Sequence, residues 1–379
     1  MAAQTSYSIA CIPGDGIGKE VVPEGVRVLD RAAQIYGFSF DWTEYPWSCE
    51  YYARHGRMMP PDGIDQLRRH DAIFLGAVGF PGVPDHVSLW GLLLPIRRKF
   101  DQYVNLRPIR LMPGMDSPLA RAVPGEIDFL IVRENTEGEY SDQGMVLAPD
   151  SAEETIVQHS VFTRKGVDRI LRYAFETAMK RNRKLTWATK SNGIFVAMPY
   201  WDRRAELIAQ VYPEVRAQQY HIDILAAHFV SRPESFDVVV ASNLMGDILS
   251  DLGAACTGTI GVAASANLNP EREHPSMFEP VHGSAPDIYG RNIANPIGQI
   301  WSGAMMLEHL GQHKAAQAVM NAIEAVLAGG PRTPDMGGTA STSEVGQAIA
   351  AALPSLQKET LGAGRGAFEA REESHPTRT

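Results

Sequence analysis

The chain has 379 residues, enough for two domains or for one large α/β domain. Hydrophobic residues make up 44% of it, as in ordinary globular proteins, and the net charge of −9 argues against nucleic acid or an anionic membrane as a partner. The first eight residues do not resemble a signal peptide, no apolar run has membrane-spanning length, and three scattered cysteines favour a reducing cytoplasm.

Alternating strand and helix patterns predict an α/β fold with a largely parallel sheet. We expect strands at 7–12, 71–78, 127–132, 185–189 and 236–241, and helices after 18 up to Gly37 and at about 90–103, 167–178, 297–310 and 313–328. The polar stretch 137–159 is expected to be irregular and could be an arm that reaches another subunit. The charged tail 361–379 is expected to be flexible.

A glycine-rich loop at 13–18 joins the first predicted strand to the first helix, which suggests a dinucleotide-binding fingerprint. However, its glycines follow the spacing G-x-G-x-G rather than G-x-G-x-x-G. No acidic residue closes a second strand at the distance that a Rossmann fold requires. The sequence therefore argues against a Rossmann fold.

Two aspartates follow the buried strand at 236–241. Ser242 and Asn243 are favourable N-cap residues, so a helix is expected to begin there and to carry Asp247 and Asp251 on one face. Their neighbours are apolar or small, so the two carboxylates must be protonated or must share a cation. Oxygen ligands without a His or Cys cluster favour Mg²⁺ or Mn²⁺. An exposed pair of helical aspartates is the alternative interpretation.

Several cationic or proton-donating side chains lie near predicted element ends. Arg97, Arg107 and Arg133 could bind carboxylates in bidentate fashion, although a solvated arginine is the simpler interpretation of each one alone. Lys190 ends a predicted strand, where it is either merely exposed or a candidate base. Tyr140 lies in the polar stretch and is a candidate general acid.

Five segments together resemble the signature sequences of the β-decarboxylating dehydrogenases, a family that includes isocitrate, 3-isopropylmalate, homoisocitrate and tartrate/D-malate dehydrogenases. They are IPGDGIG at 12–18, NLRP at 105–108, VRENTEG at 132–138, GDILSD at 246–251 and EPVHGSAPDI at 279–288. The resemblance implies two α/β domains around a mostly parallel sheet, without a Rossmann fold. A large cofactor-binding domain would combine 1–104 with 259–360, and 105–258 would form a small domain with the metal ligands and the dimer interface.

The resemblance also implies roles for individual residues. Arg97, Arg107 and Arg133 would bind the substrate carboxylates, and Tyr140 and Lys190 would be catalytic. The metal ligands would be Asp223, Asp247 and Asp251, with Lys190 and Asp223 supplied by the other subunit of a homodimer. The implied cofactor-binding residues are Asn192, Glu279, His282, Gly283, Ser284, Ala285, Asp287, Ile288 and Asn295.

The cofactor is predicted to be NAD, because Asp287 suits the ribose hydroxyls and would repel a 2′-phosphate, and no cation stands beside it or Ile288. The segment before Arg97 bears on the substrate. Gly91 and Leu93 stand where isocitrate enzymes carry a polar pair, and Trp90 stands where isopropylmalate enzymes usually carry an acidic residue. A large side chain at this position should shrink the pocket toward a small group at C3.

The sequence SLWG at 88–91 and FDQYVN at 100–105 resemble the tartrate/D-malate branch most. The expected reactions are conversion of D-malate to pyruvate and CO₂, and oxidation of tartrate to oxaloglycolate or its conversion to glycerate. One alternative is 3-isopropylmalate dehydrogenase. Alternatives of other classes are a metal-dependent hydrolase or phosphoryl-transfer enzyme, and a non-catalytic binding protein. The choice of Mg²⁺ or Mn²⁺, activation by K⁺ and assembly beyond a dimer stay open.

Overall fold

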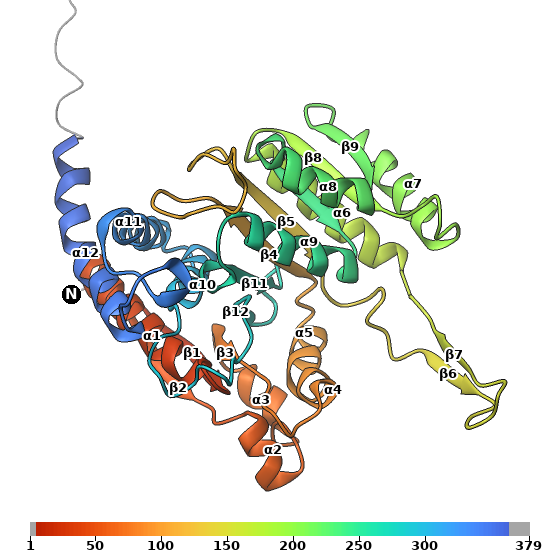
Figure 1. The fold of residues 1–379 in the computed structure, drawn as a ribbon, viewed down its shortest axis with the longest axis horizontal. Coiled ribbons are helices and arrows are strands. Elements are labelled where there is room, and N and C mark those ends of the chain that lie inside the picture. Colours follow the sequence, from red (N-terminus) through yellow and green to blue (C-terminus); the bar gives the residue numbers. More distant parts are fainter. Residues whose placement is uncertain (1–4, 364–379) are drawn as a thin grey trace, which may run out of the picture.

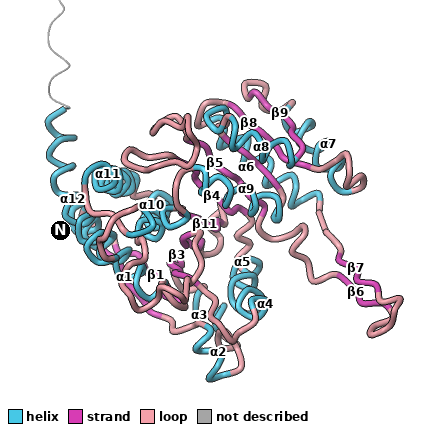
Figure 2. Tube along the Cα trace, in the orientation of Figure 1, coloured by secondary structure: helices cyan, strands magenta, loops and turns pink. Residues whose placement is uncertain are grey.

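A ten-stranded mixed sheet runs through the protein in a computed structural model that describes residues 5–363 (Figure 1). Its strand order is β2-β1-β3-β12-β11-β4-β5-β10-β8-β9. Figure 2 shows these strands in the interior, with helices around them. The strands are β1 Ser6–Gly14, β2 Ser39–Glu44, β3 Ala72–Ala77, β4 Val104–Arg110, β5 Asp128–Glu134, β8 Lys184–Thr189, β9 Arg216–His221, β10 Val238–Ala241, β11 Ala264–Leu268 and β12 Ser276–Pro280.

The helices alternate with these strands along most of the chain, which confirms the predicted α/β class. They are α1 Gly18–Tyr36, α2 Cys49–His55, α3 Gly63–Leu67, α4 Asp85–Ser88, α5 Leu94–Lys99, α6 Arg164–Met179, α7 Ala197–Ala209, α8 Ile222–Ser231, α9 Asn243–Cys256, α10 Ile297–His309, α11 His313–Gly329 and α12 Thr342–Ala363. Short helical segments lie at η1 Leu89–Leu93, η2 Pro233–Ser235, η3 Ile260–Val262 and η4 Pro334–Met336. No helix within residues 5–363 is long and apolar enough to cross a membrane.

The sheet has two halves. The terminal half holds β2, β1, β3, β12 and β11, which come from both ends of the described chain, and the central half holds β4, β5, β10, β8 and β9. Neighbouring strands are parallel toward both edges, whereas β12, β11, β4 and β5 pair antiparallel in the middle. The strand order supports the predicted division into 1–104 with 259–360 and 105–258, which stays a prediction.

The first helix forms as its sequence predicts. Val22, Leu29 and Ala33 of α1 are buried against the sheet. Gly37 ends the helix in the left-handed region, at φ 82°, and its N–H donates to the carbonyl of Ala33 at 2.9 Å. Glycine adopts this conformation without the steric cost of a Cβ atom, which explains why the helix ends there.

The glycine-rich loop before α1 packs against protein rather than presenting an open phosphate cradle. The N–H of Ile17 donates to the carbonyl oxygen of Ser284 at 2.8 Å, and that of Asp15 donates to Ala77 at 2.6 Å. At Gly16 a Cβ atom would lie 2.0 Å from the Ser284 oxygen, so only glycine permits this approach. Together with the mixed strand order, these contacts confirm that the fold is not a Rossmann fold.

The helix predicted at 90–103 has different bounds and a different geometry. Helical structure begins at Asp85, passes through a π-helical turn at η1 and ends at Lys99. Pro95 lacks the N–H that would bond to the carbonyl of Gly91, so a regular α-helix cannot continue through this point. Asp101, at φ 44°, turns the chain toward β4.

The polar stretch 137–159 was predicted to be irregular, but part of it is regular. It contains an antiparallel hairpin of β6 Gly144–Leu147 and β7 Thr155–Gln158, which projects away from the rest of the chain (Figure 1). The tail at 361–379 was predicted to be flexible, and α12 includes its first three residues, 361–363. Residues 364–379 lie outside the described residues.

Candidate active site

Two buried arginines come from neighbouring strands and face one helix. Arg107 on β4 and Arg133 on β5 lie on paired antiparallel strands, and α9 packs against both strands (Figure 1). Gly246 allows the helix to come close, since a Cβ atom there would lie 2.7 Å from the Arg133 Cβ. The close approach brings Asp247 and Asp251, on one face of α9, to the guanidinium groups.

The arginines and aspartates form a compact charge network. Arg107 Nη1 lies 3.2 Å from Asp247 Oδ1 and 3.4 Å from Asp251 Oδ1, and Arg133 forms a further ion pair with Asp247. Asn243, in the first turn of α9, accepts hydrogen bonds from Arg133 Nε at 3.1 Å and from Nη2 at 2.6 Å. Asp247 is therefore shared between two arginines, whereas the Asp251 side chain contacts Arg107 alone and is 59% exposed to solvent.

The environment shifts the pKa values of the two aspartates in opposite directions. Burial by itself raises the pKa of Asp247, but the charges of Arg133 and Arg107 outweigh it and lower that pKa below its ordinary value. Burial raises the pKa of Asp251, and Arg107 only partly opposes this. Asp247 is thus held as a carboxylate, which is the form that a cation binds.

Tyr140 reaches the same network from the loop after β5. Its hydroxyl donates to Asp247 Oδ2 at 2.9 Å, and the Arg133 guanidinium lies 5.6 Å from the centre of its ring. Burial, and next the charge of Asp247, raise the pKa of Tyr140 above its ordinary value. The phenol therefore keeps its proton near neutral pH, as a proton donor must.

Arg97 takes a different direction from the other two predicted arginines. Its Nη2 donates to Glu279 Oε1 at 2.8 Å, where Asn267 also donates, at 2.7 Å. The Arg97 Nε is buried without a hydrogen-bond partner among the described residues. An unpaired buried donor is costly, so this atom is available for an oxygen of a bound carboxylate.

Lys190 and Asp223 form a separate pair. Lys190 follows β8, Asp223 lies in the first turn of α8, and their Nζ and Oδ2 atoms are 2.9 Å apart. The side chain of Asp223 is 65% exposed, and the hydrogen bond from Lys190 lowers its pKa. Within residues 5–363 no three acidic, His or Cys side chains converge to hold a metal, so Asp223 does not join Asp247 and Asp251 in one chain.

The oxygen donors nevertheless suit a hard cation. Asp247 and Asp251 present carboxylates from one helix face, and Mg²⁺ or Mn²⁺ commonly binds with one or two carboxylates while keeping waters and substrate oxygens. Exposed apolar residues accompany both sets of acids, namely Ile224 on α8 and Leu244 and Ile248 on α9. A second copy covering these helices could bring its own Asp223 to the site.

Several of the predicted cofactor residues lie in the loop that follows β12. His282 and Ser284 are buried, Gly283 and Asp287 are exposed, and the loop at 282–285 contacts the glycine-rich loop. His282 Nε2 has no partner among the described residues, and burial lowers the pKa of this imidazole. A neutral ring with an unpaired nitrogen suits contact with an uncharged heterocycle such as adenine.

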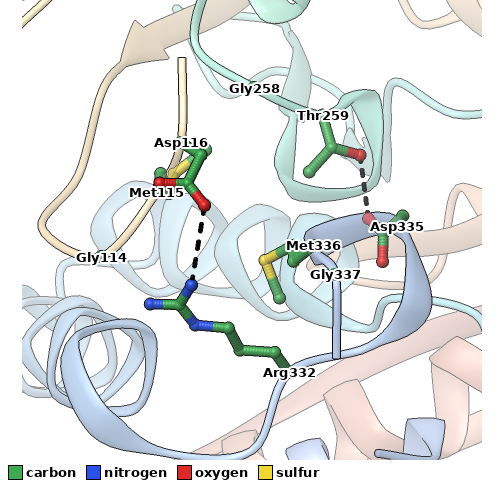
Figure 3. Close-up of a pocket in the computed structure, with 9 residues that line it drawn as sticks. All are labelled: Gly114, Met115, Asp116, Gly258, Thr259, Arg332, Asp335, Met336 and Gly337. Atoms are coloured by element: carbon green, nitrogen blue, oxygen red, sulfur yellow. Dashed lines mark hydrogen bonds and ion pairs between the residues drawn. The ribbon is translucent and has the colours of Figure 1, made fainter. Parts of the chain in front are cut away.

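Asn295 is hydrogen-bonded to Asp335, one of the residues that line a cavity (Figure 3). Its Nδ2 donates to Asp335 Oδ2 at 3.0 Å, and the same oxygen accepts from the Thr259 hydroxyl at 2.8 Å. The cavity has a volume of about 250 Å³ and lies between residues 114–116, the turn at 258–259 and residues 332–337. Asn192 lies elsewhere, in the exposed turn after Lys190, so one chain does not gather all the predicted cofactor residues.

The family model described as isocitrate/isopropylmalate dehydrogenase matches residues 8–349. The chain belongs to that family. It is 64% identical to D-malate dehydrogenase (decarboxylating) of Escherichia coli K12, over 90% of this chain and 97% of that one. It is 60% identical to the tartrate dehydrogenase/decarboxylase of Pseudomonas putida, over 93% and 99% of the two chains.

Solved structures agree with this assignment. The crystal structure of isocitrate dehydrogenase from Methylococcus capsulatus matches with a TM-score of 0.82 and 32% identity, over 92% of this chain and 99% of that chain. The predicted isocitrate/isopropylmalate dehydrogenase-like fold is confirmed. Enzymes of this family use NAD or NADP with a divalent metal ion. These relatives give no support to the alternative of a metal-dependent hydrolase or phosphoryl-transfer enzyme, or to that of a non-catalytic protein.

Two residues that were predicted to select the substrate lie on η1. Trp90 is 38% exposed, whereas Leu93 is half-buried and packs against the hydrophobic cluster that contains Ile96 and Phe100. At Gly91 a Cβ atom would lie 2.7 Å from Met58 Cγ, which explains the glycine between them. Of the two, Trp90 is the more accessible to a ligand.

The sequence analysis missed several residues that build this family's site here. Asn243 was considered only as a helix cap, yet it holds Arg133. Ser242 directly precedes α9, but its hydroxyl donates to Glu139 at 2.6 Å instead of capping the helix. Arg98, next to Arg97 in the sequence, was given no role. The available signal was that Ser242 and Asn243 stand at the start of the helix that carries Asp247 and Asp251.

Proposed function

We propose that this protein catalyses the NAD-dependent oxidation and decarboxylation of D-malate to pyruvate and CO₂, and the oxidation of tartrate with or without decarboxylation. The observation that carries the proposal is the convergence of Arg107, Arg133 and Tyr140 on Asp247 beside Asp251. The names of the two relatives at 64% and 60% identity support the same substrates. The site would work in the cytoplasm, in a homodimer.

Asp247 and Asp251 would hold a divalent cation with Asp223 of the second copy. When bound, the cation supplies a Lewis acid for the substrate oxygen at C2, and NAD supplies the hydride acceptor. Activation by K⁺ stays open, and so does the choice between Mg²⁺ and Mn²⁺. Asp287 and Ile288, with Asn295 and the unpaired His282 nitrogen, would bind the adenosine part of the cofactor.

The protein's own side chains account for the remaining steps. Arg97, Arg107 and Arg133 orient the two carboxylates of the substrate by bidentate hydrogen bonds. Lys190 of the second copy accepts the proton of the C2 hydroxyl as hydride leaves C2. After CO₂ departs, Tyr140 donates its proton to C3, which gives pyruvate. One proton is taken from the substrate and one returned, so the reaction balances.

The substrate choice rests on Trp90. Its indole occupies space that a branched C3 substituent would need, which favours a hydrogen or hydroxyl at C3. Initial rates with D-malate, L-tartrate, meso-tartrate and 3-isopropylmalate, followed at 340 nm with Mn²⁺ and NAD, test this choice. A strong preference for 3-isopropylmalate would show that the alternative is correct.

The cofactor and metal have their own tests. We expect activity to disappear when the cation is chelated and to return with Mn²⁺ or Mg²⁺, because the carboxylates alone provide no Lewis acid. NAD should be used with a far higher kcat/KM than NADP, because the Asp287 carboxylate repels a 2′-phosphate. Comparable kcat/KM values for the two cofactors would contradict this.

A further inference from the structure

Arg98 touches two parts of the proposed site at once. Its guanidinium carbon lies 4.8 Å from the centre of the Trp90 ring, a cation–π contact. Its Nη2 donates a hydrogen bond to the backbone oxygen of Tyr140 at 2.5 Å. The neighbouring Arg97 points instead to Glu279, so the two adjacent arginines serve different partners.

We infer that Arg98 is a positioning residue that couples the substrate-selecting Trp90 to the proton donor Tyr140. The inference rests on the proposed function, since it takes the roles of Trp90 and Tyr140 from it. Arg98 does not touch the reacting atoms itself. It fixes the backbone of one residue while it stacks on the side chain of the other.

The contact crosses between the two halves of the sheet. Arg98 and Trp90 precede β4, with the terminal half, whereas Tyr140 follows β5 in the central half. The other supports of this loop come from the central half: the Tyr140 hydroxyl bonds to Asp247, and Glu139 accepts hydrogen bonds from Ser242 Oγ and, at 3.2 Å, from the N–H of Leu244. Arg98 therefore fixes where the Tyr140 loop lies relative to Trp90.

Because of this arrangement, the size of the substrate's C3 substituent should affect kcat. A bulky group at C3 that displaces the Trp90 ring would also displace the guanidinium stacked on it. The Tyr140 backbone would then lose its hydrogen bond, and the phenol would move from its place at C3. Since a small misplacement of a catalytic group costs much rate, the effect should fall on kcat rather than on KM.

The test compares Arg98→Met with Lys99→Met, which removes the same charge from the next, exposed residue. With D-malate, Arg98→Met should lower kcat about tenfold. KM should stay within about twofold of the wild-type value, because Arg97, Arg107 and Arg133 still bind the substrate. Lys99→Met should change neither. A normal kcat in Arg98→Met, or a rise in KM alone, would overturn the inference.

A double-mutant cycle tests the coupling itself. In the Trp90→Leu background, Arg98→Met should lower kcat by less than about threefold, because the stacked partner is already gone. Equal effects in both backgrounds would contradict the coupling. Melting curves of all variants establish that they are folded.

A measurement independent of turnover separates this inference from the proposed function. Hydrogen exchange of the segment 136–142 should be faster in Arg98→Met than in wild type, and unchanged in Lys99→Met. If the wild-type protein oxidises none of the hydroxy acids, the proposed function is wrong. Unchanged hydrogen exchange in Arg98→Met would instead refute the positioning role of Arg98, whatever the enzyme's activity.

Discussion

The Asp247–Asp251 pair and Asp223 are proposed ligands of one cation, and Asp251 and Asp223 are both exposed, yet the charged partners of the two sets differ. The first pair lies on α9 and contacts buried Arg107 and Arg133, which lie on two neighbouring strands of the sheet. Asp223 lies at the surface with Lys190 as its partner. The first half of the site is built within one chain, whereas the second half needs a second copy to bring it to the first. We call the first, after its two buried arginines, the buried half, and the second the exposed half.

The largest expected effect falls on the exposed half. Lys190→Met should lower kcat by about 10²–10⁴-fold, the usual loss when a general base is removed. Because the Lys190 side chain is partly exposed and packs little, the melting temperature should stay near that of wild type. Steady-state rates with D-malate, beside a melting curve, measure both. A nearly normal kcat would exclude Lys190 as the base.

Mixing two inactive variants tests whether the halves come from different copies. Lys190→Met and Asp247→Asn, refolded or co-expressed together at equal amounts, should regain about a quarter of wild-type activity, because half the dimers are mixed and each has one intact site. Each variant alone serves as the control. If both halves of each site belonged to one chain, the mixture would stay inactive.

The buried half should also determine how stability depends on pH. Burial raises the pKa of Glu134, next to Arg133, to about 7, although hydrogen bonds from Thr136 and Glu137 oppose it. A carboxyl whose folded pKa lies above its unfolded pKa stabilises the protein most at low pH. That stabilisation is lost as pH rises toward 7, by up to about 3 kcal/mol.

Denaturant unfolding at several pH values between 4.5 and 8 measures this loss. Glu134→Gln should flatten the fall of unfolding free energy with rising pH, since the amide does not titrate. Asp223→Asn in the exposed half is the matched control and should leave the slope unchanged. A slope in Glu134→Gln equal to that of wild type would show that another group is responsible.

The smallest effect contrasts two glycines. Gly246→Ala would place a Cβ atom 2.7 Å from the Cβ and Cγ of Arg133, so α9 must shift. This should lower the free energy of unfolding by about 1–2 kcal/mol, after the helix propensity gained by alanine. Gly193→Ala, beside Lys190, meets no atom closer than 3.8 Å and should change it by less than about 0.5 kcal/mol. Equal losses would show that the packing argument is wrong.

Local patterns in the sequence determined much of this protein. Apolar periodicity and the closing Gly37 predicted α1, and the run before Ser242 predicted β10 and the start of α9. The spacing of Asp247 and Asp251 placed both on one helix face, because the helical repeat brings residues four apart together. The five signature segments gave the family and the fold class.

Only the tertiary structure decided which of these groups meet. Arg97, Arg107 and Arg133 are alike in sequence, but Arg97 pairs with Glu279 on β12, while the other two face α9. The order of strands sets these partners, since it brings β4, β5 and β12 near residues far away along the chain. Asp223 and Asp247 are separated for another reason: α8 and α9 contact each other, but Asp223 is exposed and pairs with Lys190, whereas Asp247 faces Arg107 and Arg133.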